Sequence, residues 1–364
     1  MFNKNTEVIQ SVLSTIIDPD LGKDWISTGC VQNIEWTLGK VTISVLLGYP
    51  AAGAVEAMKQ AISLKLMQLP GVKRVILNVE SKVHAHQVAT GLPGLPQVKN
   101  IIAIASGKGG VGKSTTAVNL ALALHIEGAQ VGILDADIYG PSQPLLLGGA
   151  AKPTIRADKK IEPLIRHGVQ VMSIGYLIDG EDTPVVWRGP MVTSALQQLL
   201  NDTAWHELDY LIIDLPPGTG DIQLTLSQKI PVTGAVIVTT PQDMALLDAK
   251  KGLAMFRKVS VPVLGLIENM SVHVCKHCGH EEHIFGEGGG ERMSAEYHVN
   301  LLGSLPLDMR IRAESDQGIP SVVRDPQSQV AQMYRKIARK MAAGLSLQPR
   351  DLRLKQASLQ IKTQ

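Results

Sequence analysis

Short apolar runs that end in acidic or glycine-rich segments recur along the chain from residue 100 onward. They lie at 100–105, 130–135, 210–214 and 263–268, and stretches with helical spacing separate them. Continuous apolar runs of this length are typical of parallel strands that are buried on both faces. The alternation of strand and helix predicts an α/β fold, with a doubly wound, mainly parallel sheet and helices on both faces.

Residues 1–80 show the pattern of a small α+β unit. Helical spacing at 7–17 stops at Asp18-Pro19, because proline cannot continue a helix. Two strands around Gly39 are expected within 31–47, a second helix at 52–66 and a last strand at 72–79. No catalytic constellation of residues is evident in this unit.

Glycine and proline mark the boundaries between the expected parts of the chain. Residues 81–99 lack any sustained period and are expected to link the small unit to a large domain at 100–344. An amphipathic helix at 328–343 closes that domain, and Pro349 interrupts the sequence beyond it. We expect the tail at 345–364 to be disordered, because its apolar residues do not gather on one helical face.

Composition excludes several classes of partner. The chain has a net charge of +2 and 4% aromatic residues, so it lacks the basic field or stacking platform that nucleic-acid binding demands. It contains no apolar run of about eighteen residues, the length that spans a membrane. Residues 1–10 are polar and do not resemble a secretory leader. These features predict a soluble, cytoplasmic protein without a nucleic-acid or membrane partner.

A phosphate-binding loop is the strongest chemical signal. It lies between the strand at 100–105 and a helix that extends to about Glu127. Glycines let successive backbone N–H groups turn toward a phosphate, and the helix N-terminus adds partial positive charge. In such a loop Lys113 would reach the β- and γ-phosphates, and the Ser114 hydroxyl would bind Mg²⁺. The loop comprises Gly107, Lys108, Gly109, Gly110, Val111, Gly112, Lys113, Ser114 and Thr115.

Acidic residues follow the next two apolar runs. Asp135 ends the run at 130–135, Asp137 lies two residues later, and Asp214 ends the run at 210–214. Ligands of an open parallel sheet bind at these strand ends, so Asp214 is the expected Walker B carboxylate, which holds Mg²⁺ through a water. No glutamate follows Asp214, so the adjacent general base of fast motors is missing and hydrolysis should be slow.

Cys275 and Cys278 form a C-x-x-C, a tight turn in which two thiolates can grip one metal or cluster edge. Three functions remain open from the residues alone: a transferable iron–sulfur cluster, a structural zinc completed by nearby histidines, and a redox dithiol. The chain has only three cysteines, so one chain cannot supply four. A symmetric homodimer would place four thiolates at its twofold axis, enough for a bridging [4Fe–4S] cluster.

Taken together, these motifs resemble the Mrp/ApbC-type iron–sulfur cluster carrier ATPases. The resemblance spans roughly residues 100–320, and Lys276 departs from it where many members have proline. The chain shares the deviant Walker A loop GKGGVGKST, followed by DIYGPS, LPPGTGD, IENMS, the C-x-x-C and FGEGGG.

The resemblance implies a role for several single residues. Lys108 would cross a dimer interface to the partner's nucleotide, although a solvated loop lysine is the simpler alternative. Asp137 would orient the attacking water. Asn269 would lie at the adenine and Pro306 would form the other wall of the base pocket. The choice of ATP over GTP follows mainly from this resemblance, since no guanine-reading NKxD tetrad is present.

The segment around Asp18 to Ile34 resembles the small domain of PaaD/SufT-type iron–sulfur assembly factors, which implies a docking or targeting role. Cys30 within it is expected to be a buried packing residue. The function predicted for the whole chain is an ATP-binding, slowly hydrolysing homodimer that carries a [4Fe–4S] cluster to apo iron–sulfur proteins. The alternatives are a MinD/ParA-like positioning ATPase and a zinc-stabilised, nucleotide-dependent adaptor.

Overall fold

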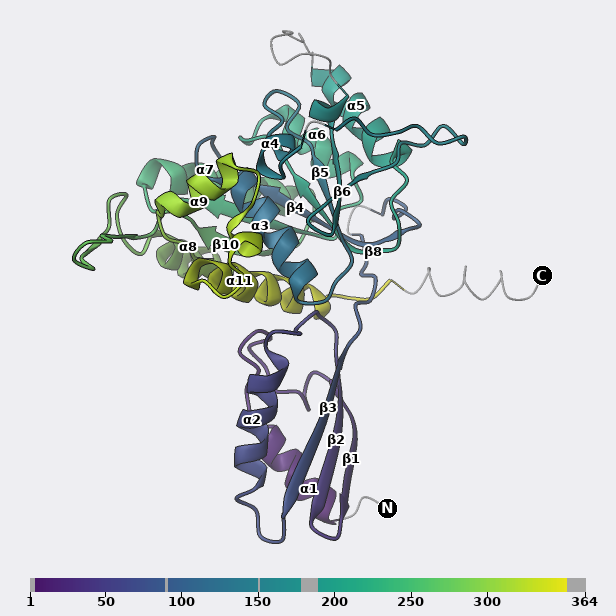
Figure 1. The fold of residues 1–364 in the computed structure, drawn as a ribbon, viewed down its shortest axis with the longest axis vertical. Helices are drawn as coiled ribbons and strands as arrows, with labels where there is room; N and C mark the ends of the chain where they lie inside the picture. Colours follow the sequence, from purple (N-terminus) through teal and green to yellow (C-terminus); the bar gives the residue numbers. More distant parts are fainter. Residues whose placement is uncertain (1–3, 89–90, 150, 178–188, 352–364) are drawn as a thin grey trace.

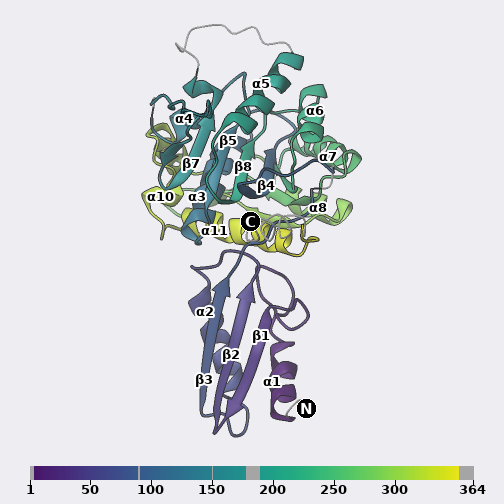
Figure 2. The ribbon, with the colours of Figure 1, turned by 90° about the vertical axis from the view of Figure 1, so that its right-hand side faces the viewer.

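The computed structural model describes residues 4–88, 91–149, 151–177 and 189–351. Figures 1 and 2 show a small N-terminal unit below a larger α/β unit, with the two arranged along the long axis of the molecule. The two units meet beside a long helix near the C-terminus, α11 (Gln329–Ser346).

The small unit is a three-stranded sheet with both of its helices on one side (Figure 1). β1 (Val31–Thr37) pairs antiparallel with β2 (Lys40–Leu47), which confirms the two strands expected around Gly39. β3 (Arg74–Ser81) runs parallel to β2, so α2 (Val55–Leu66) is the crossover between them. Every second residue of β2 is buried, as a sheet with one covered face requires.

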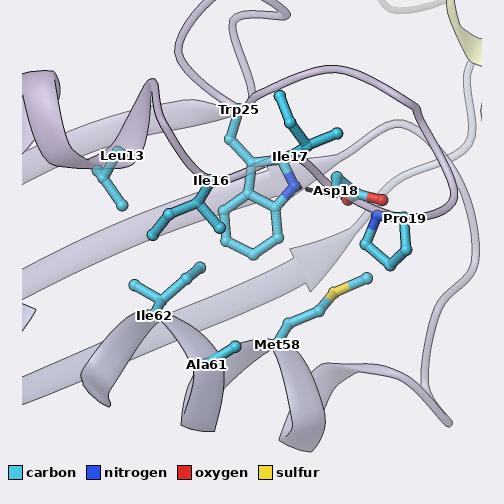
Figure 3. Close-up of a pocket in the computed structure, with 9 residues that line it drawn as sticks. All are labelled: Leu13, Ile16, Ile17, Asp18, Pro19, Trp25, Met58, Ala61 and Ile62. Carbon is cyan, nitrogen blue, oxygen red and sulfur yellow. Dashed lines mark hydrogen bonds between the residues drawn. The ribbon is translucent and has the colours of Figure 1, made fainter. Parts of the chain in front are cut away.

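The first helix, α1 (Lys4–Leu13), begins before the expected start at residue 7 and ends before residue 17, so both expected bounds were wrong. The hydroxyls of Ser14 and Thr15 bind carbonyls three residues earlier, an alternative to helical bonding that these side chains favour. The chain then turns at Asp18, which is buried and accepts hydrogen bonds from Trp25 Nε1 at 2.6 Å and from the Tyr49 hydroxyl at 2.7 Å. Figure 3 shows this indole beside a small apolar pocket between the two helices.

The large unit is built on an eight-stranded sheet in the order β13-β10-β9-β4-β8-β5-β7-β6. All neighbouring strands pair in parallel except β6, which pairs antiparallel with β7 at the edge. The predicted doubly wound, mainly parallel sheet is therefore confirmed. Its strands are β4 (Val98–Ala105), β5 (Val131–Asp135), β6 (Leu164–Arg166), β7 (Val169–Ser173), β8 (Leu208–Asp214), β9 (Gly234–Thr239), β10 (Val263–Glu268) and β13 (Leu301–Ser304).

Helices cover both faces of this sheet (Figure 2). Alternate residues of β4 show it: Ile102 and Ile104 belong to the core under α3 and α11, whereas Ile101 and Ala103 belong to the core under α5, α6 and α7. The helices are α3 (Lys113–Ile126), α4 (Gln143–Leu146), α5 (Gly189–Asp202), α6 (Asp221–Lys229), α7 (Asp243–Lys258), α8 (Gly289–Tyr297), α9 (Met309–Asp316) and α10 (Ser321–Arg324).

A buried carboxylate joins the two units. Glu127, at the C-terminal end of α3, accepts a hydrogen bond from the backbone N–H of Gly53 in the small unit at 2.7 Å. The same carboxylate binds Arg335 at 2.7 Å and Arg339 at 3.0 Å, both on α11. Arg339 also binds Asp20 of the small unit at 2.9 Å. These five groups form a continuous polar network across the contact between the units.

The C-terminal helix extends further than expected. α11 continues to Ser346, past the predicted end at residue 343. Beyond it, Pro349 and Asp351 form backbone hydrogen bonds with Gln87 and Ala85 of the connection between the units. Residues 352–364 of the predicted tail lie outside the described residues. Among the helices described, none has both the length and the apolar character needed to cross a membrane.

Replacing Glu127 by Ala should lower the free energy of unfolding by about 3–5 kcal/mol, because the buried Arg335 would lose its counter-charge. Urea denaturation followed by circular dichroism measures this. Asp316→Ala is the control, since its ion pair with Arg312 is exposed and should cost about 1 kcal/mol or less. A loss for Glu127→Ala no larger than that of the control would show that the network does not stabilise the fold.

Candidate functional site

The phosphate-binding loop connects β4 to α3, as the sequence predicts. Gly110 and Gly112 have φ values of 80° and 81°, a left-handed conformation that side chains other than glycine rarely adopt. Gly107 packs against the backbone of α7, where an added Cβ would lie 2.3 Å from the carbonyl carbon of Asp248. Local backbone conformation and close packing therefore both require glycine in this loop.

Lys113, the first residue of α3, lies beside three other residues that the sequence predicts for the site. Its ammonium group is buried and forms an ion pair with Asp214. It also donates to the Ser114 hydroxyl at 3.2 Å and lies 4.0 Å from the Asp137 carboxylate. Four residues predicted from three separate segments thus meet at one point, beside the ends of β4, β5 and β8.

Asp135 and Asp214 lie opposite each other on the neighbouring strands β5 and β8. Burial, together with the nearby Asp214 carboxylate, raises the pKa of Asp135 to about 7. Asp135 accepts hydrogen bonds from Ser173 Oγ at 3.0 Å and from the backbone N–H groups of Asp137 and Gln143, both at 3.1 Å. Asp135 therefore shapes the loop that carries Asp137, whose pKa is raised by burial.

Lys108 points away from this cluster. Its ammonium group donates to Gln242 Oε1 at 3.1 Å, at the residue before α7. Sequence reasoning did not identify Gln242, since nothing local links residues that are 134 positions apart. The expected contact of Lys108 with a partner's nucleotide stays a prediction.

Asn269 follows β10 and is buried against the phosphate-binding loop. Its Nδ2 donates to the Val111 carbonyl at 2.9 Å, and its Oδ1 accepts the backbone N–H of Met270 at 3.0 Å. Pro306 is half-buried, and backbone hydrogen bonds of its neighbours Leu305 and Leu307 hold it beside the chain that follows Asn269. The two residues expected to flank a base thus lie on adjacent segments, while base recognition itself stays a prediction.

The cysteines lie at the tip of a hairpin formed by β11 (His273–Val274) and β12 (Glu281–Glu282), which projects from the large unit at the left of Figure 1. Cys278 is exposed and Cys275 is half-buried. The backbone N–H groups of Cys278 and His277 point at the Cys275 sulfur and lower the pKa of its thiol. An accessible pair of thiols with a stabilised thiolate suits a metal or cluster ligand.

The histidines near this hairpin do not complete a metal site. The Nδ1 atoms of His273 and His283 lie 3.1 Å and 2.9 Å from the backbone carbonyls of Leu307 and Ser271. Within the part of the chain that the structure describes, no group of three or more potential ligands gathers around one point. A zinc site completed by local histidines of one chain therefore has no support in this geometry. Cys30, by contrast, is buried in the small unit, as expected.

The comparisons with known families agree with this geometry. Residues 97–342 match the family described as NUBPL iron-transfer P-loop NTPase, and residues 6–77 match the family described as iron-sulfur cluster assembly protein. An "Iron-sulfur cluster carrier protein" from Haemophilus influenzae is 50% identical over 338 residues, 93% of this chain and 91% of the relative. A relative with the same name from Escherichia coli K12 is 48% identical over 339 residues, 93% of this chain and 92% of the relative.

Two solved structures show the fold of the large unit. A nucleotide-binding protein from Archaeoglobus fulgidus, in complex with ADP, is 38% identical, with a TM-score of 0.54 over 61% of this chain and 87% of the other. The cell division ATPase MinD from Pyrococcus furiosus is 25% identical, with a TM-score of 0.52 over 66% of this chain and 98% of the other.

Iodoacetamide at neutral pH should modify Cys275 faster than Cys30. The pKa of Cys275 is lowered by backbone N–H groups, so more of it is thiolate, whereas burial raises the pKa of Cys30. Mass spectrometry of quenched samples gives both rates. In urea the two rates should converge, and equal rates in the folded protein would contradict the hairpin geometry.

Proposed function

Because the chain belongs to the NUBPL family of iron-transfer P-loop NTPases, we propose that it binds ATP, hydrolyses it slowly and carries an iron–sulfur cluster to apo iron–sulfur proteins. The observation that carries this proposal is the coexistence, in one domain, of a complete phosphate-binding loop and an exposed cysteine hairpin. A positioning ATPase such as MinD shares the fold, but a positioning function would not require the exposed cysteine hairpin.

Nucleotide binding follows from the loop and from Lys113. The backbone N–H groups between Gly107 and Thr115 would surround the phosphates at the N-terminus of α3. Lys113 would exchange its ion pair with Asp214 for the β- and γ-phosphates, which offer it more negative charge. This exchange would free Asp214 Oδ1, while Gln143 Nε2 would still bind Oδ2.

The residues at this point also fit a magnesium ion. The Ser114 hydroxyl and Asp214 are hard oxygen ligands, and they lie beside the same ammonium group. The buried Gln143 Oε1 on the loop after Asp137 has no partner among the described residues, so an acceptor is available there. Ser114 would hold Mg²⁺ directly and Asp214 through a water, and the ion would neutralise charge on the phosphates.

Hydrolysis would depend on Asp137. It lies 4.0 Å from the Lys113 ammonium, the group expected to bind the β- and γ-phosphates, so its carboxylate would orient the attacking water there. Leu215 rather than a glutamate follows Asp214, so the site has no adjacent general base. This arrangement favours slow hydrolysis, which would depend on the assembly state of the protein, over rapid turnover.

Cluster binding would require a homodimer. One hairpin supplies Cys275 and Cys278, and the described part of a single chain offers no further ligands around them. A [4Fe–4S] cluster takes four thiolates, which two hairpins at a twofold axis would provide. Lys108 would reach the partner's nucleotide in the same dimer. The nucleotide sites and the shared cluster would then both depend on formation of that dimer.

The small unit would dock assembly factors or recipients, in keeping with its match to an iron-sulfur cluster assembly family.

We expect cluster transfer to take place in the cytoplasm, because unpaired thiols persist in a reducing compartment. All three cysteines of the chain are free in the structure.

Lys113→Ala should nearly abolish both tight ATP binding and hydrolysis, because the cation on the β- and γ-phosphates is lost. Lys108→Ala should retain most of the nucleotide affinity and lose at least about tenfold in turnover, since the residue acts in the dimer. Phosphate release and binding of a fluorescent ATP analogue measure the two effects. Wild-type turnover in Lys108→Ala would exclude the role across the interface.

Cys275→Ser and Cys278→Ser should each abolish cluster binding while ATP binding persists, because the phosphate-binding loop lies on a different segment. Anaerobic reconstitution followed by visible spectroscopy measures cluster content. Cys30→Ser is the matched control and should keep its cluster, since Cys30 lies in the small unit. Retention of a cluster after loss of both hairpin cysteines would overturn the proposed cargo site.

A further inference from the structure

Gln143 is the first residue of α4 and directly follows the loop that connects Asp137 to that helix. Its side chain is completely buried. The amide Nε2 donates to Asp214 Oδ2 at 2.9 Å and lies 3.4 Å from the Ser114 carbonyl oxygen. The backbone N–H of Gln143 donates to Asp135 Oδ2 at 3.1 Å. One residue therefore contacts both buried aspartates and the first turn of α3.

The chemistry of its neighbours fixes which end of the Gln143 amide faces Asp214. The Asp214 carboxylate, paired with Lys113, and the Ser114 backbone carbonyl are both acceptors. Only the NH₂ group can face them, so the amide oxygen must point elsewhere. The orientation of this side chain thus follows from its surroundings and not from an arbitrary choice between nitrogen and oxygen.

The Gln143 amide oxygen is buried and has no hydrogen-bond partner among the described residues. Buried acceptors without a donor are rare, because they lose their hydrogen bonds to water without replacement. Amide bond lengths place Oε1 roughly 2.3 Å from Nε2. Adding the 2.9 Å hydrogen bond puts it no further than about 5 Å from Asp214 Oδ2, which one water molecule can bridge.

Asp214 has both carboxylate oxygens occupied in this state. Lys113 binds Oδ1 and Gln143 binds Oδ2. If phosphates drew Lys113 away, Oδ1 would become free while Gln143 still held Oδ2. The carboxylate would then keep its orientation and present Oδ1 toward the side of the Ser114 hydroxyl, which Lys113 also contacts.

We propose that Gln143 is a positioning residue of the metal–nucleotide site: its Nε2 fixes the Asp214 carboxylate and its Oε1 accepts a hydrogen bond from a water bound to Mg²⁺. This inference rests on the proposed nucleotide function and adds a residue to it. Gln143 lies within the segment DADIYGPSQP, which contributes to the family resemblance, but the sequence alone assigned it no role.

Gln143→Leu tests the proposal through Mg²⁺ binding and not through turnover. Calorimetric titration of ADP in the presence of Mg²⁺ should show roughly tenfold weaker affinity than in the wild type, because the metal's water loses its acceptor and Asp214 its support. The same titration in EDTA should match the wild type. Equal affinities in Mg²⁺ would overturn the proposal, as would an equal loss in EDTA, which indicates general damage to the site.

Gln170→Leu is the matched control. Gln170 lies on β7, outside the nucleotide cluster, and is also buried. Its Nε2 donates a hydrogen bond to the His206 carbonyl at 2.8 Å. Its replacement should leave both titrations unchanged. If Gln143→Leu fails to fold, Gln143→Met carries the same test, because methionine matches glutamine in length and lacks both polar atoms.

Asp214→Asn separates failure of this inference from failure of the proposed function. If Asp214→Asn leaves the Mg²⁺ dependence of ADP binding unchanged, Asp214 is not in the metal shell and the underlying assignment is wrong. If Asp214→Asn weakens binding in Mg²⁺ but Gln143→Leu does not, only the role of Gln143 is wrong. Adding Gln143→Leu to Asp214→Asn should cost less than Gln143→Leu does alone, since the two residues act together.

Discussion

The buried ammonium group of Lys113 is the interaction on which the nucleotide site depends. Asp135, Asp137 and Asp214 lie at the ends of adjacent segments, and burial together with the charge of Asp214 raises the pKa values of Asp135 and Asp137. A single buried cation between Asp214 and Asp137 offsets that effect and keeps the carboxylates together. Under the proposed nucleotide function, phosphates would compete for the same cation, and the cluster would rearrange when they bind.

The helix that begins at Lys113, α3, also extends to the small unit. Its other end is Glu127, where an acidic group meets the negative end of the helix dipole and would be unfavourable alone. Arg335 and Arg339 compensate it, and the Gly53 N–H completes its hydrogen bonds. A single helix therefore carries the buried Lys113 cluster at one end and the contact with the small unit at the other.

Sequence reasoning identified the features that local patterns encode. Apolar runs predicted the parallel sheet, the glycine spacing predicted the phosphate-binding loop, and the C-x-x-C predicted a tight turn, which the structure places at the tip of a hairpin; the comparisons confirm the family resemblance. It missed Gln143, Gln242 and Glu127, whose partners are distant in the chain. The end of α1 was also missed, because Ser14 and Thr15 bind the backbone locally and override the apolar period. The roles of Asp137, Asn269 and Pro306 stay predictions.

Native mass spectrometry of the wild-type protein after anaerobic reconstitution tests the proposal that two chains share one cluster. A dimer that holds one [4Fe–4S] cluster is expected, about four irons for two chains, with no such species for the single chain. A single chain that carries a cluster alone, or that carries one zinc and no iron, would contradict it.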